Sequence, residues 1–252
     1  MQIQGKAAMV VGGASGMARA TAEMLREAGA DVAILDLPQS AGAQVAAGMG
    51  ATFHPCDVMD GDSVDAAFAS AMDALGALHI AVNTAGGGIA MRTISKKGPH
   101  PIDEFRRVIE FSLVATFNLN RLQAWHMREN EPEEGERGVI IDTASVAAFE
   151  GQIGQVAYTA AKAGVAAMML PMARDLGTLG IRSVAIAPSL FETGLTSLAP
   201  PEMQAELTRD TAFPRRMGKP EEYAQLALAI VRNPMLNGSC IRLDAGVRFA
   251  PK

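Results

Sequence analysis

Short apolar runs alternate with longer amphipathic stretches along this chain. Seven runs predict buried strands, because they are short, rich in Val, Ile, Leu and Ala, and bounded by glycine or polar residues. These runs cover residues 6–11, 31–35, 51–56, 79–82, 138–141, 181–187 and 239–243. Helical patterns follow the first glycine turn, to about residue 28, and cover residues 63–75, 102–127, 155–176 and 220–231. The alternation predicts an α/β fold: a doubly wound (Rossmann) parallel sheet of about seven strands.

Composition narrows the class of protein. The 252 residues, 49% hydrophobic and 19% charged, suffice for a single domain over residues 1–252, and no linker divides it. A formal net charge of −5 argues against nucleic acid as a partner. Cys56 and Cys240 have no metal or redox spacing and the four histidines are scattered, so we expect no metal site and a cytoplasmic location. No apolar run approaches the roughly 20 residues of a membrane span, so none is expected.

The end of the first strand carries a glycine turn, GGASGMA, directly before a helix. Strand, glycine turn and helix together predict phosphate binding, because the glycines let the backbone approach a pyrophosphate and the helix N-terminus favours an anion. The residues expected to contact the nucleotide are Gly12, Ser15, Gly16 and Met17. An ordinary strand-to-helix turn remains the alternative.

Asp36, followed by Leu37, ends the second strand about 20 residues after the glycine turn. A carboxylate at this position accepts the ribose hydroxyls of NAD and repels the 2′-phosphate of NADP. No Arg stands beside Asp36 in LDLPQS, so the sequence predicts NAD as the cofactor, with Asp36 and Leu37 as contacts. A solvated Asp at a strand end is the alternative.

Ser145, Tyr158 and Lys162 form a candidate catalytic group. Ser145 follows a predicted strand, and Tyr158 and Lys162 stand at i and i+4 on the predicted helix 155–176, so the two side chains share one face. A nearby ammonium group stabilises a phenolate and lowers its pKa, which would make Tyr158 a general acid/base. Ser145 would hold the substrate oxygen by a hydrogen bond. A Tyr-x-x-x-Lys pair on an ordinary helix surface is the alternative.

These three residues in this arrangement resemble the active site of the short-chain dehydrogenase/reductase family. The stretches TASVAAFEGQIGQVAY and LPMARDLGTLGIRSVAIAPSLFET resemble one branch of it, the type 2 3-hydroxyacyl-CoA dehydrogenases, which also oxidise hydroxysteroids. The resemblance covers nearly the whole chain. It implies that Lys162 and Tyr158 also contact the cofactor, with Lys162 on the nicotinamide ribose.

The resemblance also implies further cofactor contacts. In the family, a pair at the end of the third strand brackets the adenine, an N-x-A-G turn lies under the cofactor, and a loop after the sixth strand touches the nicotinamide. Ser189 replaces the usual Gly in that last loop. The matching residues in this chain are Asp57, Val58, Asn83, Thr84, Ala85, Gly86, Pro188, Phe191 and Thr193.

Two positions depart from the family pattern inside the expected site. Ser112 stands where the family usually carries an Asn that completes a catalytic tetrad through a bound water. Asp142 replaces an expected neutral polar residue in a buried strand, where a carboxylate without a partner would cost stability. In the loop 86–101, Lys96 and Lys97 are candidates to meet the phosphates of a CoA ester; a solvated loop is an equal alternative.

The resulting prediction is an NAD-dependent oxidoreductase that interconverts a secondary alcohol and a ketone. The expected substrate is a 3-hydroxyacyl-CoA, placing it in fatty acid metabolism, or a hydroxysteroid-like alcohol. The alternatives are a 3-oxoacyl-[acyl-carrier-protein] reductase, against which Asp36 argues, and a catalytically weak cofactor-binding scaffold, which turnover would exclude. The resemblance further implies a homotetramer. Residues 195–213 are expected to form an apolar lid over the substrate.

Overall fold

One seven-stranded parallel sheet forms the centre of the computed structural model, which describes residues 1–193 and 200–251. The strand order is β3-β2-β1-β4-β7-β8-β9, and each neighbouring pair is parallel. This order confirms the predicted doubly wound sheet. The strands are β1 (Ala7–Val11), β2 (Asp31–Asp36), β3 (Thr52–Pro55), β4 (Ile80–Asn83), β7 (Gly138–Thr143), β8 (Ile181–Pro188) and β9 (Cys240–Leu243).

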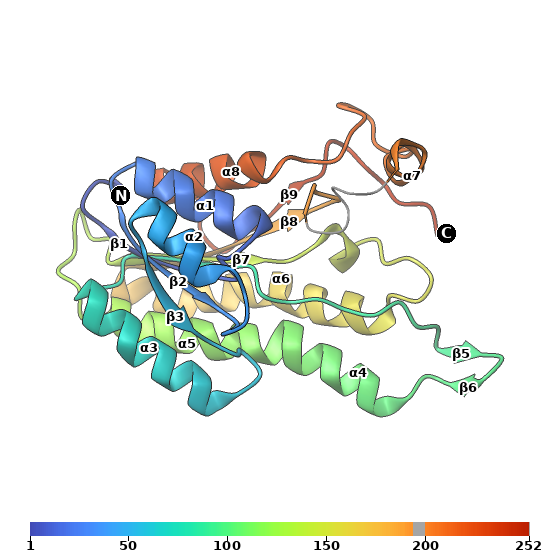
Figure 1. Ribbon diagram of the computed structural model, residues 1–252, viewed down its shortest axis with the longest axis horizontal. Helices are drawn as coiled ribbons and strands as arrows, with labels where there is room; N and C mark the ends of the chain where they lie inside the picture. Colours follow the sequence, from blue (N-terminus) through green and yellow to red (C-terminus); the bar gives the residue numbers. More distant parts are fainter. Residues whose placement is uncertain (194–199, 252) are drawn as a thin grey trace.

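Helices cover both faces of the sheet (Figure 1). On one face lie α1 (Gly16–Glu27), α2 (Gly42–Met49) and α8 (Pro220–Arg232). On the other lie α3 (Gly61–Leu75), α5 (Ala115–Met127) and α6 (Val156–Leu176). The chain enters α5 through α4 (Ile102–Ile109) and one π-helical turn, η1 (Glu110–Val114).

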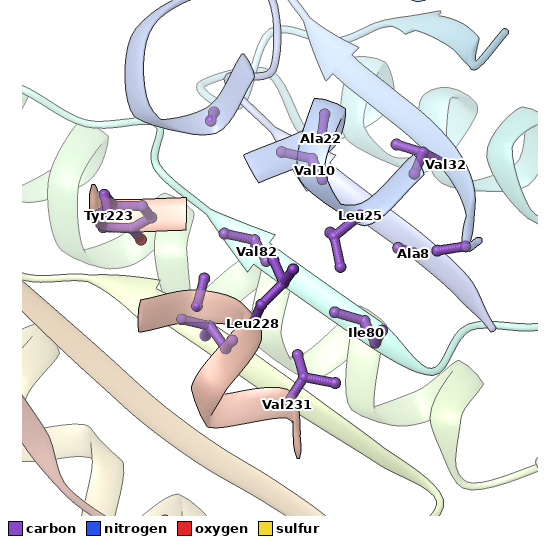
Figure 2. Packing of buried hydrophobic residues seen from close by; sticks show 14 of the residues in the cluster. Ala8, Val10, Ala22, Leu25, Val32, Ile80, Val82, Tyr223, Leu228 and Val231 are labelled. Carbon is purple, nitrogen blue, oxygen red and sulfur yellow. The ribbon is translucent and has the colours of Figure 1, made fainter. Parts of the chain in front are cut away.

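Successive residues of each strand point to opposite faces of the sheet, so each strand contributes side chains to the cores on both faces. Figure 2 shows Val10 and Val82 of the central strands packed with Leu25 of α1 and Leu228 of α8. The residue next to Val10, Met9, points into the opposite core with α3, α5 and α6. Strands buried on both faces explain why the sequence shows continuous apolar runs there.

The structure adds three elements that the hydrophobic pattern did not indicate. Helix α2 lies between β2 and β3. The expected polar loop after β4 contains a small hairpin, β5 (Ile94–Ser95) and β6 (Gly98–Pro99), which projects at one end of the molecule (Figure 1). The expected lid 195–213 lies partly outside the described residues, and its described part contains α7 (Pro201–Leu207).

The expectation that no apolar run approaches the length of a membrane span is wrong for one helix. The stretch Val156–Leu179 is long and apolar enough by length and composition, with a mean hydropathy of 1.3. Helix α6 nevertheless packs beside β8 and carries the buried Lys162. Only 28% of the apolar window is buried, so much of its apolar surface faces outward.

We predict that Arg182→Met lowers the free energy of unfolding by about 3–5 kcal/mol, because it breaks a buried ion pair and leaves Glu136 with the N-terminal ammonium group of Met1 as its remaining cation. The Arg182 side chain, 7% exposed, bonds Glu136 at 2.7 Å and donates to the carbonyls that end α8, including those of Ile230 and Val231. Urea unfolding measures the change. Arg106→Met, which breaks an exposed pair with Asp103, is the control and should cost less than about 1 kcal/mol. Equal losses in the two variants would contradict the prediction.

Candidate active site

The glycine turn between β1 and α1 is held in conformations that side chains disfavour. Gly12 has φ +83° and Gly16 has φ +54°. A Cβ on Gly12 would lie 2.6 Å from the hydroxyl oxygen of Thr84, and one on Gly16 would lie 2.9 Å from Thr193. Ser15 begins α1 without a side-chain cap on the first turn, which leaves the helix N–H groups available to an anion. The turn therefore lets its backbone come close to a bound ligand.

A cavity of about 580 Å³ opens beside this turn. It lies at the carboxyl ends of β1 and β4, where the strand order reverses and doubly wound sheets bind nucleotides. Most of the predicted cofactor residues line it: Gly12, Ser15, Gly16, Met17, Asp36, Leu37, Asp57, Val58, Thr84, Ala85, Gly86 and Thr193.

The Asp36 carboxylate is fixed at the cavity wall by two backbone N–H groups. Ala14 donates to Oδ2 at 2.9 Å and Leu37 donates to Oδ1 at 2.7 Å. Each oxygen keeps a further lone pair for a ligand hydroxyl. The glycine turn and the carboxylate are thus one rigid unit rather than two independent features.

Five residues predicted to contact the cofactor do not line this cavity: Tyr158 and Lys162 of the catalytic group, and Asn83, Phe191 and Pro188. The Asn83 side chain is buried and bonds inward to Asn120, Gln123 and Asp142. Phe191 is 6% exposed and packs in the hydrophobic core with the α8 side chains. Pro188 is a buried end residue of β8. The side chains of Asn83 and Phe191 are taken up by packing inside the fold, and their predicted cofactor contacts stay predictions.

The three predicted catalytic residues are brought together at the end of β7. Ser145 begins the short 3₁₀ helix η2 (Val146–Ala148), and its Oγ accepts the Ala147 N–H at 3.1 Å. The same hydroxyl is hydrogen-bonded to Tyr158 on α6. One turn later, Lys162 is buried and its Nζ donates to the Thr143 carbonyl at 2.7 Å. The Lys162 Nζ lies 5.9 Å from the centre of the Tyr158 ring.

Burial is the largest cause of the pKa shifts of Tyr158 and Lys162 in this catalytic group. It raises the pKa of Tyr158, and the hydrogen bond from Ser145 acts in the opposite direction. Burial also lowers the pKa of Lys162 to about 8. The expectation that Lys162 depresses the Tyr158 pKa is therefore wrong in this structure, and the phenol is protonated at neutral pH.

A strap of three glycines, Gly86 to Gly88, joins the cavity to the catalytic group. Gly86 lines the cavity, and a Cβ there would lie 3.0 Å from the Lys162 Nζ. A Cβ on Gly88 would lie 2.8 Å from the Tyr158 ring. A side chain at Gly86 or Gly88 would push against Lys162 or Tyr158, whereas a Cβ at Gly87 would meet the Phe111 ring at 3.4 Å.

Ser112 holds the strap in place from the π-helical turn. Its Oγ accepts the Gly87 N–H at 2.9 Å and donates to the Gly87 carbonyl at 2.7 Å. Departures from α-helical pitch of this kind often occur at functional sites. The hydroxyl is thus committed to the backbone, and its predicted part in proton transfer stays a prediction.

The partner of Asp142, which the sequence did not identify, is a pair of buried amides. Asn83 donates to Oδ1 at 2.9 Å and Asn120 donates to Oδ2 at 2.6 Å. Burial still raises the pKa of Asp142 to about 6, although the amides and the charge of Lys162 oppose the rise.

Comparison with known proteins places this geometry in a family. A family model described as Enoyl-(Acyl carrier protein) reductase matches residues 12–248. The 3-hydroxyacyl-CoA dehydrogenase type-2 of Drosophila melanogaster is 48% identical, over 99% of this chain and 100% of that protein. The Homo sapiens protein of the same name is 47% identical, over 99% of this chain and 97% of that protein. The chain belongs to the short-chain dehydrogenase/reductase family.

Solved structures of this family agree with the fold. This short-chain dehydrogenase superposes on a 3-hydroxyacyl-CoA dehydrogenase type-2 from Mycobacterium avium with a TM-score of 0.94, 40% identity and complete coverage of both chains. It also matches a 7α-hydroxysteroid dehydrogenase complexed with NADH and 7-oxo glycochenodeoxycholic acid, with a TM-score of 0.89 and 28% identity over 100% of this chain and 97% of that chain. The protein is an oxidoreductase that acts on an alcohol or a ketone with a nicotinamide cofactor.

Several residues of this dehydrogenase line the cavity without having been predicted. Gln39 follows Asp36 by three residues, and its position just after a strand end was the sequence signal that would have placed it at the cavity. Cys56 was expected in a core; it borders the cavity, where burial raises the pKa of its thiol to about 12 and keeps it unreactive. The unpredicted lining residues are Val11, Leu35, Gln39, Cys56 and Phe111.

We predict that Gly12→Ala weakens NADH binding by about tenfold or more. Alanine at positive φ costs about 1–2 kcal/mol, and its Cβ would collide with Thr84. Fluorescence titration with NADH measures the loss. Gly48→Ala is the control: it lies within α2 with open space at its Cβ, so binding should be unchanged and helix propensity should favour stability. Unchanged NADH affinity in a folded Gly12→Ala protein would refute the role of the turn.

Proposed function

We propose that this protein is an NAD-dependent 3-hydroxyacyl-CoA dehydrogenase, interconverting the 3-hydroxyacyl and 3-oxoacyl forms. The observation that carries the proposal is the arrangement of Ser145, Tyr158 and Lys162 beside the Gly86 strap, which borders the nucleotide cavity. The protein combines a nucleotide site with an acid/base group at one end of it. The proposed reaction needs both.

The residues at the cavity fit a dinucleotide. The glycine turn and the uncapped start of α1 suit a pyrophosphate, and Asp36 presents two fixed carboxylate oxygens to ribose hydroxyls. When bound, the nicotinamide cofactor supplies the group that accepts a hydride from the alcohol or donates one to the ketone. A 2′-phosphate at the Asp36 position would meet a like charge, which supports NAD over NADP.

Tyr158 is the proposed proton carrier at the substrate oxygen. In reduction its hydroxyl donates a proton to the developing alkoxide, and in oxidation it accepts the proton of the alcohol. Ser145 donates a hydrogen bond that holds the same oxygen in place. Because burial raises the pKa of Tyr158, the protonated phenol is ready for ketone reduction at neutral pH, whereas oxidation requires the proton to leave first.

The acyl-CoA assignment draws on the named relatives and on the surface near the site. Lys96 and Lys97 are exposed at the turn of the β5–β6 hairpin, where their ammonium groups are available to bind the phosphates of a CoA ester. Exposed apolar side chains near the same end of the molecule, including Ile94 and Ile153, suit an acyl chain. An acyl-carrier-protein substrate is the second candidate, since the family model carries that description, but Asp36 disfavours the NADPH expected of such a reductase.

We also propose a homotetramer located in the cytoplasm and active in fatty acid metabolism. The outward apolar surface of α6 and of the 3₁₀ turn after it, η3 (Gly177–Leu179), supports assembly, because Leu170 and Leu179 are 48% and 38% exposed. On the neighbouring α5, Phe117 and Trp125 are about half exposed, and a groove of about 310 Å³ is lined by Phe117, Trp125 and Leu179. A second copy of this chain would cover that surface. Both cysteines are free thiols, which suits a reducing compartment.

We predict that NADH binds at least about tenfold more tightly than NADPH, a difference of only about 1.4 kcal/mol. Asp36→Asn should shrink this ratio, because it removes the charge that repels the 2′-phosphate while keeping the shape. Parallel fluorescence titrations give both dissociation constants. Asp31→Asn changes a carboxylate at the opposite end of β2 and should leave the ratio intact. A wild-type ratio near one would sink the NAD assignment.

We predict that Tyr158→Phe lowers turnover of acetoacetyl-CoA by about 10²-fold to 10⁴-fold and leaves NADH affinity nearly unchanged. The change removes the hydroxyl and keeps the ring against the strap. Steady-state kinetics and NADH titration measure the two effects. Tyr223→Phe, at the only other tyrosine of the chain, should keep most of the turnover while losing about 1 kcal/mol of stability with its Thr143 hydrogen bond. If Tyr158→Phe retains a large part of the activity, the proton passes through another group.

A further inference from the structure

We infer that Asp142 is a positioning residue for the reaction, a buried counter-charge that keeps Lys162 protonated and thereby sets the alkaline limit of turnover. The inference rests on the catalytic role proposed for Lys162. Nothing in the family pattern leads to it, because this position departs from that pattern. It follows from the placement of one carboxylate and one ammonium group in the same dry layer.

The two groups lie on the same side of the sheet. Along β7, Ile140 points into the core with α3, α5 and α6, so Asp142, two residues later, points the same way. Lys162 reaches the sheet from α6, on that same side. Its Nζ is hydrogen-bonded at 2.7 Å to the carbonyl of Thr143, the residue directly after Asp142. One peptide unit therefore separates the backbone position of the carboxylate from the carbonyl that holds the ammonium group.

Asp142 has hydrogen bonds but no adjacent cation. It is fully buried, and its two oxygens accept from the neutral amides of Asn83 and Asn120. Among residues 1–193 and 200–251, no Lys, Arg or His lies within ion-pair distance of its oxygens. Amide donors satisfy the lone pairs and leave the negative charge uncompensated. The buried cation of this layer that compensates it is Lys162.

A stripe of buried polar side chains runs from η1 along one side of α5 between the two groups. Its members are Ser112 of η1 and Thr116, Asn120 and Gln123 of α5; the α5 members are spaced four and three residues apart, which places them on one helix face. Ser112 is at one end, on the strap next to Lys162, and Thr116 donates to the Ser112 carbonyl at 3.2 Å. Asn120 and Gln123 are at the other end, bonded to Asp142 and Asn83. The stripe keeps the layer between the groups polar, although no bulk water reaches it.

Each charge stabilises the other against burial. The Asp142 charge acts to raise the pKa of Lys162, which burial lowers to about 8, and the Lys162 charge acts to lower the pKa of Asp142, which burial raises to about 6. On α6, Tyr158 lies one turn from Lys162, whereas Arg174 and Asp175 lie in the last turn of the helix. Tyr223 reaches Thr143 from α8 on the far side of the sheet at 2.8 Å. Both tyrosines are neutral at pH 7 because burial raises the pKa of each. Between about pH 6 and pH 8, carboxylate and ammonium are therefore charged together.

The test is the pH profile of Asp142→Asn. Removing the carboxylate lets the Lys162 pKa fall further, so the alkaline limb of kcat for acetoacetyl-CoA reduction should move to lower pH by about one unit. Well above that limb, turnover should be roughly tenfold below wild type, since one unit corresponds to a factor of ten. Asp142→Glu keeps the charge and should keep the wild-type limb even where stability falls. A purely structural role would lower turnover equally at every pH.

A second readout does not depend on activity. In protein carrying lysine labelled with ¹³C at Cε, the Lys162 resonance reports its own titration midpoint, which should be lower in Asp142→Asn than in wild type. Lys162→Met assigns the resonance. Asp142→Thr, neutral and suited to a strand, serves where Asp142→Asn does not fold. An unchanged midpoint and an unchanged alkaline limb in a folded neutral variant would overturn the inference.

The same variants separate this inference from the proposed function. Full turnover by Lys162→Met would reject the catalytic role of Lys162, and the resonance midpoint would still decide whether Asp142 holds its charge. Loss of turnover in Lys162→Met, together with an unshifted profile in Asp142→Asn, would leave the proposed function standing and reject the role of Asp142.

Discussion

The buried ammonium group of Lys162 is the constraint on which this site depends. A cation without water must be held by other dipoles and charges, and here the Thr143 carbonyl holds it directly. That contact requires α6 to lie close against the end of β7. The same closeness brings Tyr158 to Ser145 and leaves room for nothing larger than glycine between them and the nucleotide cavity. The position of one charge thus fixes the backbone of three separate segments.

The sheet supplies the rigidity that this constraint demands. Seven parallel strands end at one edge, and their apolar faces are closed by helices on both sides. Near that edge, beneath the site, Asn83 and Asp142 occupy neighbouring positions on β4 and β7. Most positions of the central strands are apolar, and the buried polar residues Arg182 and Ser183 lie at the start of β8, away from the site. This division lets a stable core and a charged catalytic layer coexist in one sheet.

The sequence predicts the framework better than the contacts. The doubly wound sheet follows from the alternation of strand and helix patterns, and the glycine turn, Asp36 and the catalytic group follow from short motifs with a fixed geometry. The inward packing of the Asn83 and Phe191 side chains was not predicted, since a motif gives the backbone position but not the face to which a side chain turns. The partners of Asp142 could not be predicted, because Asn83 and Asn120 are far from it in the chain. The pKa of Tyr158 depends on burial, which no spacing reveals.

The π-helical turn at Glu110–Val114 determines how α4 and α5 are rotated relative to one another. A π turn holds an extra residue, and each residue of an α-helix advances the helical angle by about 100°. The wider turn thus changes the phase between the α4 residues before it and the α5 stripe after it. A chain shortened by one residue here would recover a regular helix, but Asn120 and Gln123 would be swung away from Asp142 and Asn83. The irregular turn thus lets one long helical segment pack α4 against α6 and turn the buried polar side chains of α5 toward the sheet.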